Sequence, residues 1–484
     1  MTSLSMPVLD RRRAAAVALV ALPTLLGLVL AAWNLGHKPL WYDETFEALM
    51  AMMPPFRFAR FLATFETTGA FYHVLLWLWK LVGTSEAVLR LPSLVFAVAS
   101  LPVVFAIARR RLTPVWSAAA VTLLALSGFW VHYAQEARPY ALWMLMASLS
   151  TLALLRAVEM PGRSRWLVYG VATVLGVWSH LMMVFVVAGQ VLALAVHPDV
   201  RRWWRPAAAA VLAAALAAVP IAVSIMLANQ ARWDWLPSPT LEALWAGMRT
   251  VAGSVGDLAA LAWLAGLLVG AGVVLRAWLS DRRGAWPMVL VLTWAIVPFV
   301  GPWLASHVRE MYTPRYLFGV LPAVVLVITF GVAALRPRPL AIAALAGLLV
   351  IGGIGVAHWH TREDRVDWRS ATRVVVEGGT RQDGLAFFTI GTFDGGALYQ
   401  YRYYLTQFES GDRPTIVRLP DDGTPLEQQV AAAIAGWPRL WAVIGAPGEP
   451  DTRRALAVVE REFALASEQP FEGLTVRLYV RAAP

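Results

Sequence analysis

Residues 114–155 read PVWSAAAVTLLALSGFWVHYAQEARPYALWMLMASLSTLALL, two long apolar runs on either side of the polar stretch HYAQEARPY. Runs of about 20 apolar residues are long enough to cross the hydrocarbon core of a membrane as helices. The rest of the chain shares this character, because 58% of its residues are hydrophobic and only 15% are charged. The composition therefore predicts a polytopic α-helical membrane protein.

Apolar runs of this kind recur along the sequence, and we expect about eleven spanning helices. They lie at residues 14–33, 91–108, 113–131, 139–155, 166–179, 181–196, 206–228, 258–275, 287–305, 316–335 and 340–357. Arginines flank the long run 166–196 at both ends, and basic loops favour the cytoplasm, so we expect the chain to turn back near His180. The same rule places the N-terminus in the cytoplasm and HYAQEARPY on the opposite side.

The net charge of +10 arises largely from arginines in the short gaps between apolar runs, so we expect no nucleic-acid partner. The N-terminal sequence RRRAAAVALVALPTLLGLVLAAW also fits a cleaved signal peptide. Its apolar stretch is longer than a usual signal core, which favours a retained membrane anchor. Cysteine is absent from the sequence, which excludes disulfides and thiolate metal sites.

Two regions outside the spans have a pattern of their own. In the first outer loop, residues 34–90, we expect an amphipathic helix over 45–53 and an interfacial helix that starts near Phe71. From residue 358 short strands alternate with amphipathic helices; we predict strands at 384–390, 415–420, 439–447 and 474–480, and helices at 425–436 and 452–464. We therefore expect a transmembrane domain over 1–357 and an extracytoplasmic α/β domain over 358–484.

The interiors of the predicted spans carry no charged residue, and polar side chains collect at the outer helix ends. Asp43 and Glu44 are candidate catalytic carboxylates in the first outer loop; alternatively, they only stabilise the N-terminus of the helix there. In the second outer stretch Arg138 is a candidate ligand of an anionic group, with Glu136 and Tyr140 beside it. The alternative is a salt bridge between Glu136 and Arg138 at the membrane rim.

The third outer loop, SHVREMYTPRYLF, contributes Arg309, Arg315 and Tyr316. Arginines on the side where positive charge is disfavoured indicate an anion there. The alternative is an anchoring role, with aromatic residues at the interface and a surface salt bridge to Glu310. His180, at the outer turn of the predicted hairpin, is either a substrate contact or a polar residue that only lines the loop.

Five motifs together resemble the bacterial family 39-like glycosyltransferases of the GT-C superfamily, whose relatives include protein O-mannosyltransferases and the lipid A aminoarabinose transferase. In chain order they are YDE, FYHVLLWLWKLVGTSEAVLRLPSLVFAV, HYAQEARPYALWMLMASLSTLALL, TPRYLFGVLPA and DRVDWRSATRVV. Where relatives have a Pro-Pro-Leu-Tyr-Tyr element this chain has TTGAFYH at 67–73, so only Tyr72 carries over.

The resemblance implies a glycosyltransferase of the bacterial cytoplasmic membrane that works on the extracytoplasmic side. Its donor would be a sugar on a polyprenyl phosphate, and its acceptor an envelope lipid, polysaccharide or protein. We expect Asp43 to act as the base, with Glu44 orienting it, and Arg138, Arg315, Arg309 and Tyr316 to stabilise the leaving phosphate.

Inversion at the anomeric carbon would follow from that mechanism. No organic cofactor is implied, and a divalent cation on the outer acidic residues stays an open alternative. The competing interpretations are a flippase of lipid-linked saccharides, a polymerase or ligase that uses a polyprenyl-diphosphate oligosaccharide, and an inactive scaffold.

Overall fold

The computed structural model of the chain describes residues 8–227, 236, 238–389, 396–408, 412–419 and 423–482. The chain forms two compact units. The first contains Met1–Leu35, Pro54–Trp79 and Arg90–Arg362, and the second contains Gly36–Met53, Lys80–Leu89 and Glu363–Pro484. Two segments of the first outer loop therefore fold together with the C-terminal part of the chain.

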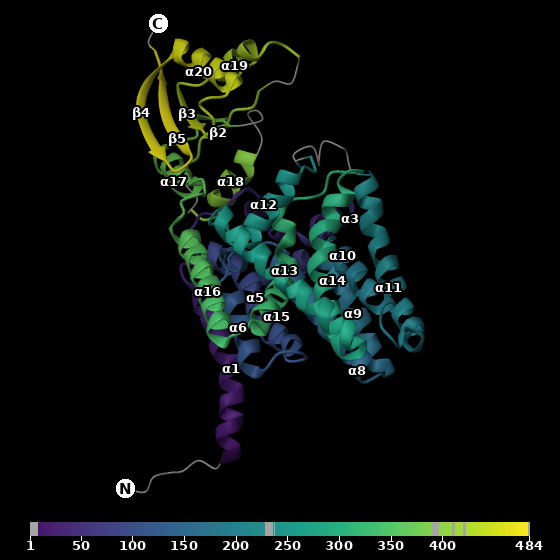
Figure 1. Cartoon of the computed structure of the whole chain (residues 1–484). Helices are drawn as coiled ribbons and strands as arrows, with labels where there is room; N and C mark the ends of the chain where they lie inside the picture. The colour runs from purple at the N-terminus through teal and green to yellow at the C-terminus, as the bar shows by residue number, and fades with distance from the viewer. Residues whose placement is uncertain are drawn as a thin grey trace, which may run out of the picture. The chain divides into compact units, whose positions relative to one another are not determined.

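The first unit is helical (Figure 1). Its elements are α1 (Val8–Ala32), α3 (Pro55–Thr64), α4 (Ala70–Trp79), α5 (Glu86–Ala108), α6 (Pro114–Ala125), α7 (Gly128–Ala134), α8 (Tyr140–Glu159), α9 (Arg163–Ser179), α10 (Met183–Ala195), α11 (Val200–Leu227), α12 (Leu241–Val251), α13 (Asp257–Ser280), α14 (Arg282–Ala305), the 3₁₀ helix η2 (Pro314–Val320), α15 (Leu321–Ala334) and α16 (Arg338–Thr361). The first residues of α5 belong to the second unit.

Within the described part of the chain, eight helices are long and apolar enough to cross a membrane, or nine if the bent pair α6 and α7 is one span. The protein is therefore a multi-pass helical membrane protein. The predicted spans 166–179 and 181–196 correspond to α9 and α10, and the chain leaves helical geometry at His180 between them, as the flanking arginines predict. The predicted number of spans and the cytoplasmic N-terminus stay predictions.

Small residues let several helices of the first unit pack backbone against backbone. A Cβ atom on Gly270 in α13 would lie 2.0 Å from the carbonyl oxygen of Val327 in α15. A Cβ atom on Gly128 in α7 would lie 2.4 Å from the carbonyl oxygen of Gly355 in α16. Close approach of this kind is the usual way in which helices associate in lipid, where no hydrophobic force drives them together.

The polar stretch HYAQEARPY follows a sharp bend in the chain. Helices α6 and α7 meet at an angle of 64°. At the bend the Oγ atom of Ser127 accepts a hydrogen bond of 3.4 Å from the backbone N–H of Trp130 and so caps α7. Pro139 precedes the first residue of α8. Residues 135–139 are therefore an irregular segment held between two helices.

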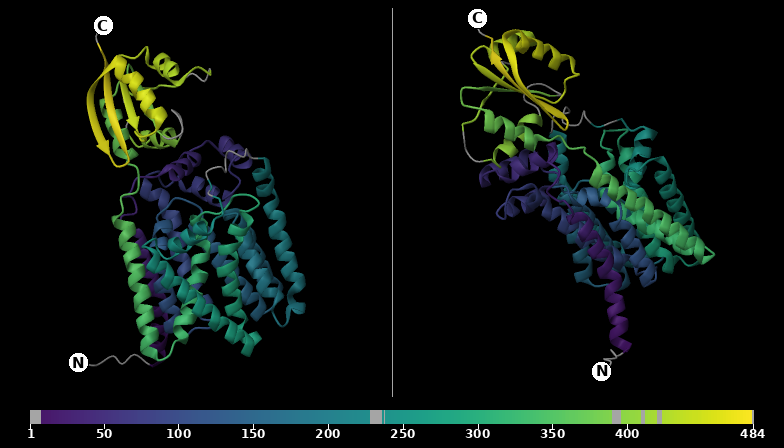
Figure 2. Two further views of the ribbon diagram at one scale, coloured as in Figure 1. Left: turned by 45° about the horizontal axis from the view of Figure 1, so that its top comes forward. Right: turned by 90° about the vertical axis from the view of Figure 1, so that its left-hand side faces the viewer.

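The second unit contains a five-stranded sheet in the order β2-β1-β3-β5-β4 (Figure 2). The strands are β1 (Gly384–Phe388), β2 (Thr415–Ile416), β3 (Arg439–Ile444), β4 (Phe463–Phe471) and β5 (Leu474–Arg481). β1 pairs in parallel with β2 and β3, whereas β5 pairs antiparallel with β3 and β4. In register, Leu385 lies opposite Trp441 and Val443 opposite Val476.

Five helices complete the second unit: α2 (Tyr42–Ala51), α17 (Trp368–Gly378), α18 (Gly396–Leu405), α19 (Leu426–Ile434) and α20 (Pro450–Glu462). α19 packs against α20, α17 packs against α18 and β5, and α2 packs against α18. The core under α19 and α20 is apolar and includes Phe388, Ile444 and Val459. The outer-loop helix α2 is thus a structural part of this unit.

Sequence pattern predicts four of the five strands and misses β4, α17 and α18. Seven of the nine residues of β4 are exposed, so this edge strand lacks the alternation of apolar and polar residues that identifies a half-buried strand. The amphipathic helix expected over 45–53 starts earlier, at Tyr42. This earlier start places Asp43 and Glu44 inside the first helical turn.

Candidate functional site

In the first unit, three segments bring predicted site residues together. Tyr140 is the first residue of α8, His180 lies in the break between α9 and α10, and Tyr316 belongs to η2. The centroid of the His180 ring lies 5.5 Å from that of Tyr140 and 4.9 Å from that of Tyr316. The Tyr140 and Tyr316 centroids are 6.4 Å apart. The three rings therefore form one aromatic cluster, built from residues far apart in the sequence.

Two guanidinium groups lie beside this cluster. The Cζ atom of Arg138 is 5.8 Å from the ring centroid of Tyr140, and the Cζ atom of Arg315 is 5.9 Å from that of Tyr316. Both distances are in the range of cation–π attraction. Guanidinium N–H groups match the oxygens of a phosphate or carboxylate, so two of them near one another are suited to an anion.

His180 is electrically neutral in this setting. Burial, reinforced by the positive charges of Arg138 and Arg315, lowers the pKa of His180 from its usual 6.5 to about 3. Its Nδ1 atom lies 3.2 Å from the backbone nitrogen of Met182 and accepts that N–H. The single proton of the neutral ring is therefore on Nε2, which makes that atom a hydrogen-bond donor.

Trp143 supports His180 and was not predicted as a site residue. Its indole is fully buried and stacks on the His180 ring, with centroids 4.8 Å apart and an interplanar angle of 21°. A Cβ atom on Gly319 would lie only 2.5 Å from the indole. Trp143 lies one helical turn after Tyr140 in α8. This spacing places the two aromatic side chains on the same helix face, and it is the sequence feature from which Trp143 could be predicted as a neighbour of the site.

Tyr72 is connected to the backbone of Arg138. In α4 its hydroxyl lies 3.2 Å from the Oγ atom of Ser93 in α5, and that Oγ donates a hydrogen bond of 3.2 Å to the carbonyl oxygen of Arg138. Tyr72 and Ser93 are both fully buried. This chain of contacts joins Tyr72, the one residue carried over from its divergent motif, to the irregular segment before α8.

Two further predicted residues make contacts of other kinds. Glu136 is buried, and its Oε2 atom lies 3.2 Å from the Nε2 atom of His132, whose ring stacks on Trp359 at a centroid distance of 4.0 Å. Arg309 donates a hydrogen bond of 3.4 Å to the carbonyl oxygen of Ile225 in α11. Glu136 therefore supports the packing of α7, and Arg309 contacts the C-terminal end of α11.

Asp43 and Glu44 belong to the second unit, in the first turn of α2. Asp43 is half-buried, whereas Glu44 is fully buried and its Oε2 atom accepts the backbone N–H of Trp41 at 3.4 Å. Glu44 thus caps the first turn of α2. Glu47, one turn after Asp43 on the same helix face, is a buried carboxylate that the sequence interpretation did not single out.

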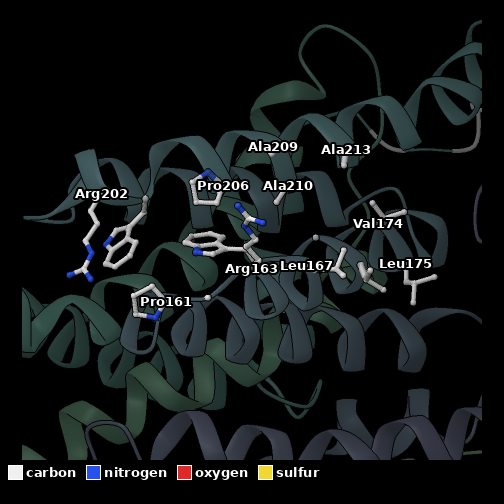
Figure 3. A pocket seen from close by; sticks show the side chains of 15 residues that line it. Pro161, Arg163, Leu167, Val174, Leu175, Arg202, Pro206, Ala209, Ala210 and Ala213 are labelled. Atoms are coloured by element: carbon white, nitrogen blue, oxygen red, sulfur yellow. The ribbon is translucent and has the colours of Figure 1, made fainter.

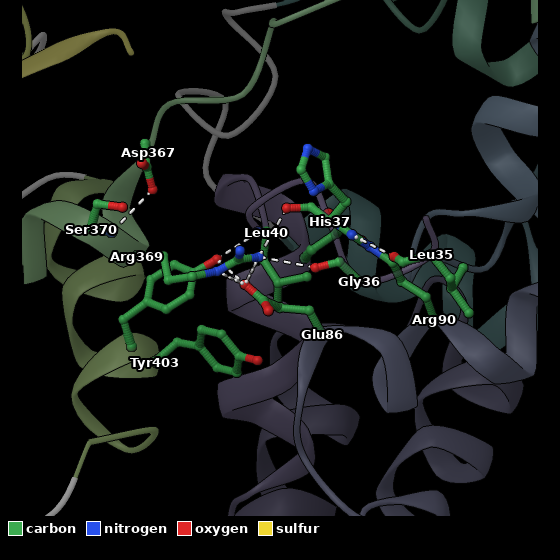
Figure 4. A network of polar contacts seen from close by, with 12 residues as sticks. Leu35, Gly36, His37, Leu40, Glu86, Arg90, Asp367, Arg369, Ser370 and Tyr403 are labelled. Carbon is green, nitrogen blue, oxygen red and sulfur yellow. Dashed lines mark hydrogen bonds and ion pairs between the residues drawn. The ribbon is translucent and has the colours of Figure 1, made fainter. Parts of the chain in front are cut away.

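A polar network within the second unit fixes the segments on either side of α2 (Figure 4). Glu86 Oε1 accepts hydrogen bonds of 2.8 Å from Arg369 Nε and from the hydroxyl of Tyr404. That hydroxyl in turn accepts the backbone N–H of Leu40 at 2.7 Å, and Arg369 Nη2 donates to the carbonyl oxygen of Gly36 at 3.1 Å. Burial and the neighbouring Glu86 raise the pKa of Tyr404.

Among the residues that the structure describes, no group of three or more His, Asp or Glu side chains is arranged to hold a metal ion. The most concentrated set of predicted site residues consists of two arginines and three aromatic rings: Arg138, Arg315, Tyr140, Tyr316 and His180. They combine positive charge, aromatic faces and one neutral imidazole. This set is suited to an anionic group that carries a polar ring.

A family model described as dolichyl-phosphate-mannose-protein mannosyltransferase matches residues 70–227. This stretch contains Tyr72, Arg138, Tyr140 and His180. A search of curated proteins found no match.

Solved structures are similar over nearly the whole chain. ArnT from Cupriavidus metallidurans in the apo state has a TM-score of 0.60 and 16% identity, covering 96% of this chain and 98% of ArnT. The same protein bound to undecaprenyl phosphate has a TM-score of 0.59 and 15% identity, covering 95% and 97%. The archaeal oligosaccharyltransferase AglB from Archaeoglobus fulgidus, in complex with an inhibitory peptide and a dolichol-phosphate, has a TM-score of 0.52 and 11% identity, covering 97% and 74%. At these identities the similarity shows a shared fold.

Proposed function

We propose, from the premise that this chain is a GT-C superfamily member similar to the PMT- and ArnT-like glycosyltransferases, that it transfers a sugar from a polyprenyl-phosphate donor to an envelope acceptor. The observation that carries the proposal is the placement of Arg138 and Arg315 beside the ring cluster of Tyr140, His180 and Tyr316. ArnT from Cupriavidus metallidurans has been solved with undecaprenyl phosphate bound, which supports a lipid phosphate as the anion.

In the proposed reaction Arg138 and Arg315 bind the donor phosphate. As the bond between the anomeric carbon and the phosphate oxygen breaks, negative charge builds up on the phosphate, and both guanidinium groups stabilise it more in the transition state than in the bound donor. Loss of one such donor group typically raises the barrier by ~2.7 to 4 kcal/mol. The Nε2–H of His180 supplies a further hydrogen bond to a phosphate or sugar oxygen.

Asp43 is the proposed general base. Its carboxylate would take the proton from an acceptor hydroxyl while the hydroxyl oxygen attacks the anomeric carbon. The electron pair of the cleaved bond leaves with the polyprenyl phosphate, so the products are a glycoside of inverted configuration and the free lipid phosphate. Glu44, which caps the first turn of α2, positions Asp43. We place this reaction on the extracytoplasmic side of the bacterial cytoplasmic membrane.

The test compares three versions of the full chain in a deletion strain of the source organism: wild type, Asp43→Asn and Asp451→Asn. Asp451 is also a first-turn aspartate, in α20, and is exposed, so it controls for the substitution itself. Mass spectrometry of envelope glycans should show one sugar type that wild type and Asp451→Asn restore and Asp43→Asn does not.

Binding of undecaprenyl phosphate to the purified proteins separates catalysis from donor binding. We expect Asp43→Asn to bind this lipid as wild type does, because Asp43 acts on the acceptor. Restoration of the glycan by Asp43→Asn would refute the base assignment. A sugar type that is missing in the deletion strain and that Asp43→Asn restores, with lipid-linked saccharide accumulating on the cytoplasmic side of the deletion strain, would support a flippase instead.

A further inference from the structure

A pocket of about 800 Å³ lies between α9 and the N-terminal half of α11, in the first unit (Figure 3). Its lining begins at the N-terminal end of α9, opposite to His180, which follows the last residue of that helix. The residues that create the space are small, including Gly170, Ala209, Ala210 and Ala213. Larger apolar side chains at these positions would fill it. A volume of this size is typical of a ligand site.

The two ends of the pocket differ in polarity. Figure 3 shows Arg202 at one end, Arg163 nearer the middle, and Val174, Leu175 and Ala213 toward the other end. A ligand that matches this lining has an anionic head and an apolar tail. Both arginines lie at the N-terminal ends of their helices, where the chain is expected to meet the cytoplasmic surface of the membrane.

Among the residues that the structure describes, neither Arg163 nor Arg202 forms an ion pair with an acidic side chain. No acidic residue lines the pocket. Of the carboxylates that precede α9 and α11 in the described chain, Glu159 pairs with Arg110 at 2.8 Å and Asp199 pairs with Arg283 at 2.7 Å. Each of these carboxylates has a cation that does not line the pocket.

Trp203 supplies an independent observation. Its side chain lines the pocket, is only 5% exposed, and has its Nε1–H without a hydrogen-bond partner among the described residues. A buried donor of this kind usually finds an acceptor. The ester or phosphate oxygens of a lipid head group would provide one beside Arg202, whose Cζ atom lies 4.6 Å from the Trp203 ring centroid.

From these observations we propose that the pocket binds an anionic glycerophospholipid of the leaflet that contains the N-terminal ends of α9 and α11. The phosphate contacts Arg202, a head-group oxygen accepts the Trp203 Nε1–H, Arg163 adds positive charge further along the lining, and one acyl chain lies along the small residues of α11. Basic pockets between membrane helices bind lipid head groups in this way. The site is separate from the proposed donor site at the other end of α9.

Native mass spectrometry of the full-length protein in detergent tests the proposal with phosphatidylglycerol and phosphatidylcholine as probes. Wild type should bind phosphatidylglycerol more tightly than phosphatidylcholine. The double variant Arg163→Ala/Arg202→Ala should bind phosphatidylglycerol roughly 30-fold more weakly, the product of about fivefold for each arginine at a membrane surface. Arg201→Ala is the matched control, because Arg201 is an exposed neighbour in α11 that does not line the pocket; it should bind like wild type.

A second variant tests the pocket itself without changing charge. Ala209→Trp, at an exposed position of the lining, should fill the space and displace phosphatidylglycerol. Equal binding of the two phospholipids by wild type, or equal loss in Arg201→Ala and the double variant, would overturn the proposal. Undecaprenyl phosphate that binds through Arg163 and Arg202 in place of phosphatidylglycerol would also overturn it and assign the pocket to the substrate lipid.

Discussion

Gly319→Ala tests whether the aromatic cluster depends on close packing behind it. In η2, a Cβ atom at this position would lie 2.5 Å from the indole of Trp143, whereas carbon atoms in contact are about 3.5 Å apart. The indole must therefore retreat by about 1 Å. Trp143 is fully buried and stacks on His180, so we expect this movement to displace the imidazole.

The expected cost can be given for stability and for binding. Forcing an extra methyl group into a close-packed core costs ~1 to 3 kcal/mol, so thermal unfolding in detergent should occur at a lower temperature. A displaced His180 loses a hydrogen bond to a charged group, worth about 1.5 kcal/mol or more, so the Kd for undecaprenyl phosphate should rise about tenfold.

Gly353→Ala in α16 is the matched control for this substitution. A Cβ atom there meets nothing within 4 Å, and alanine is the better helix former by ~0.5 to 1 kcal/mol. Gly353→Ala should therefore be at least as stable as wild type and bind the lipid phosphate normally. If Gly319→Ala matches Gly353→Ala in both measurements, the proposed coupling from η2 through Trp143 to His180 is wrong.

Two further predictions concern the second unit and pH. Arg369→Ala should destabilise the protein by ~1 to 3 kcal/mol, because Glu86 keeps only the Tyr404 hydroxyl as a donor and the Gly36 carbonyl loses the Arg369 donor. Arg369→Lys should recover part of that loss in thermal unfolding. The pKa of His180 is about 3 in the folded protein and about 6.5 in the unfolded chain. Lowering the pH below about 6.5 therefore protonates this imidazole only in the unfolded state, which stabilises the unfolded state. Wild type should lose up to ~2 kcal/mol of stability between pH 7 and 5. A His180→Gln variant should lack this share of the pH dependence; parallel pH profiles of the two proteins would contradict the prediction.

Hydropathy and charge predict most of the membrane part. Every predicted span coincides with a helix or a helix pair, and the break at His180 follows from basic residues at both ends of one long run. Their positions at predicted helix ends make Arg138, Tyr140, His180 and Tyr316 candidate site residues from the sequence alone. The sequence does not reveal that they form one cluster, because their proximity depends on how α8, α9 and η2 pack.

The residues that pack against the aromatic cluster are harder to predict, because their contacts also depend on how the helices pack. Trp143 and Gly319 are ordinary apolar residues in their local sequence, and only the fold brings them into contact. Helix α17 had a local signal, since Asp367 accepts the backbone N–H of Ser370 at its start and one helix face is apolar. The division of the first outer loop between two units rests on long-range packing that no periodicity reports.

That division matters for experiments that shorten the chain. A stop codon after Arg362 would delete Tyr404 and Arg369, so the Leu40 N–H and the Glu86 carboxylate would lose their partners, and α2 would lose the helix on which it packs. The segment that carries Asp43 would be left without its scaffold. Loss of activity in such a truncation would therefore reflect collapse of the first outer loop. An acceptor-binding role for the deleted residues must be tested with point substitutions on their exposed faces.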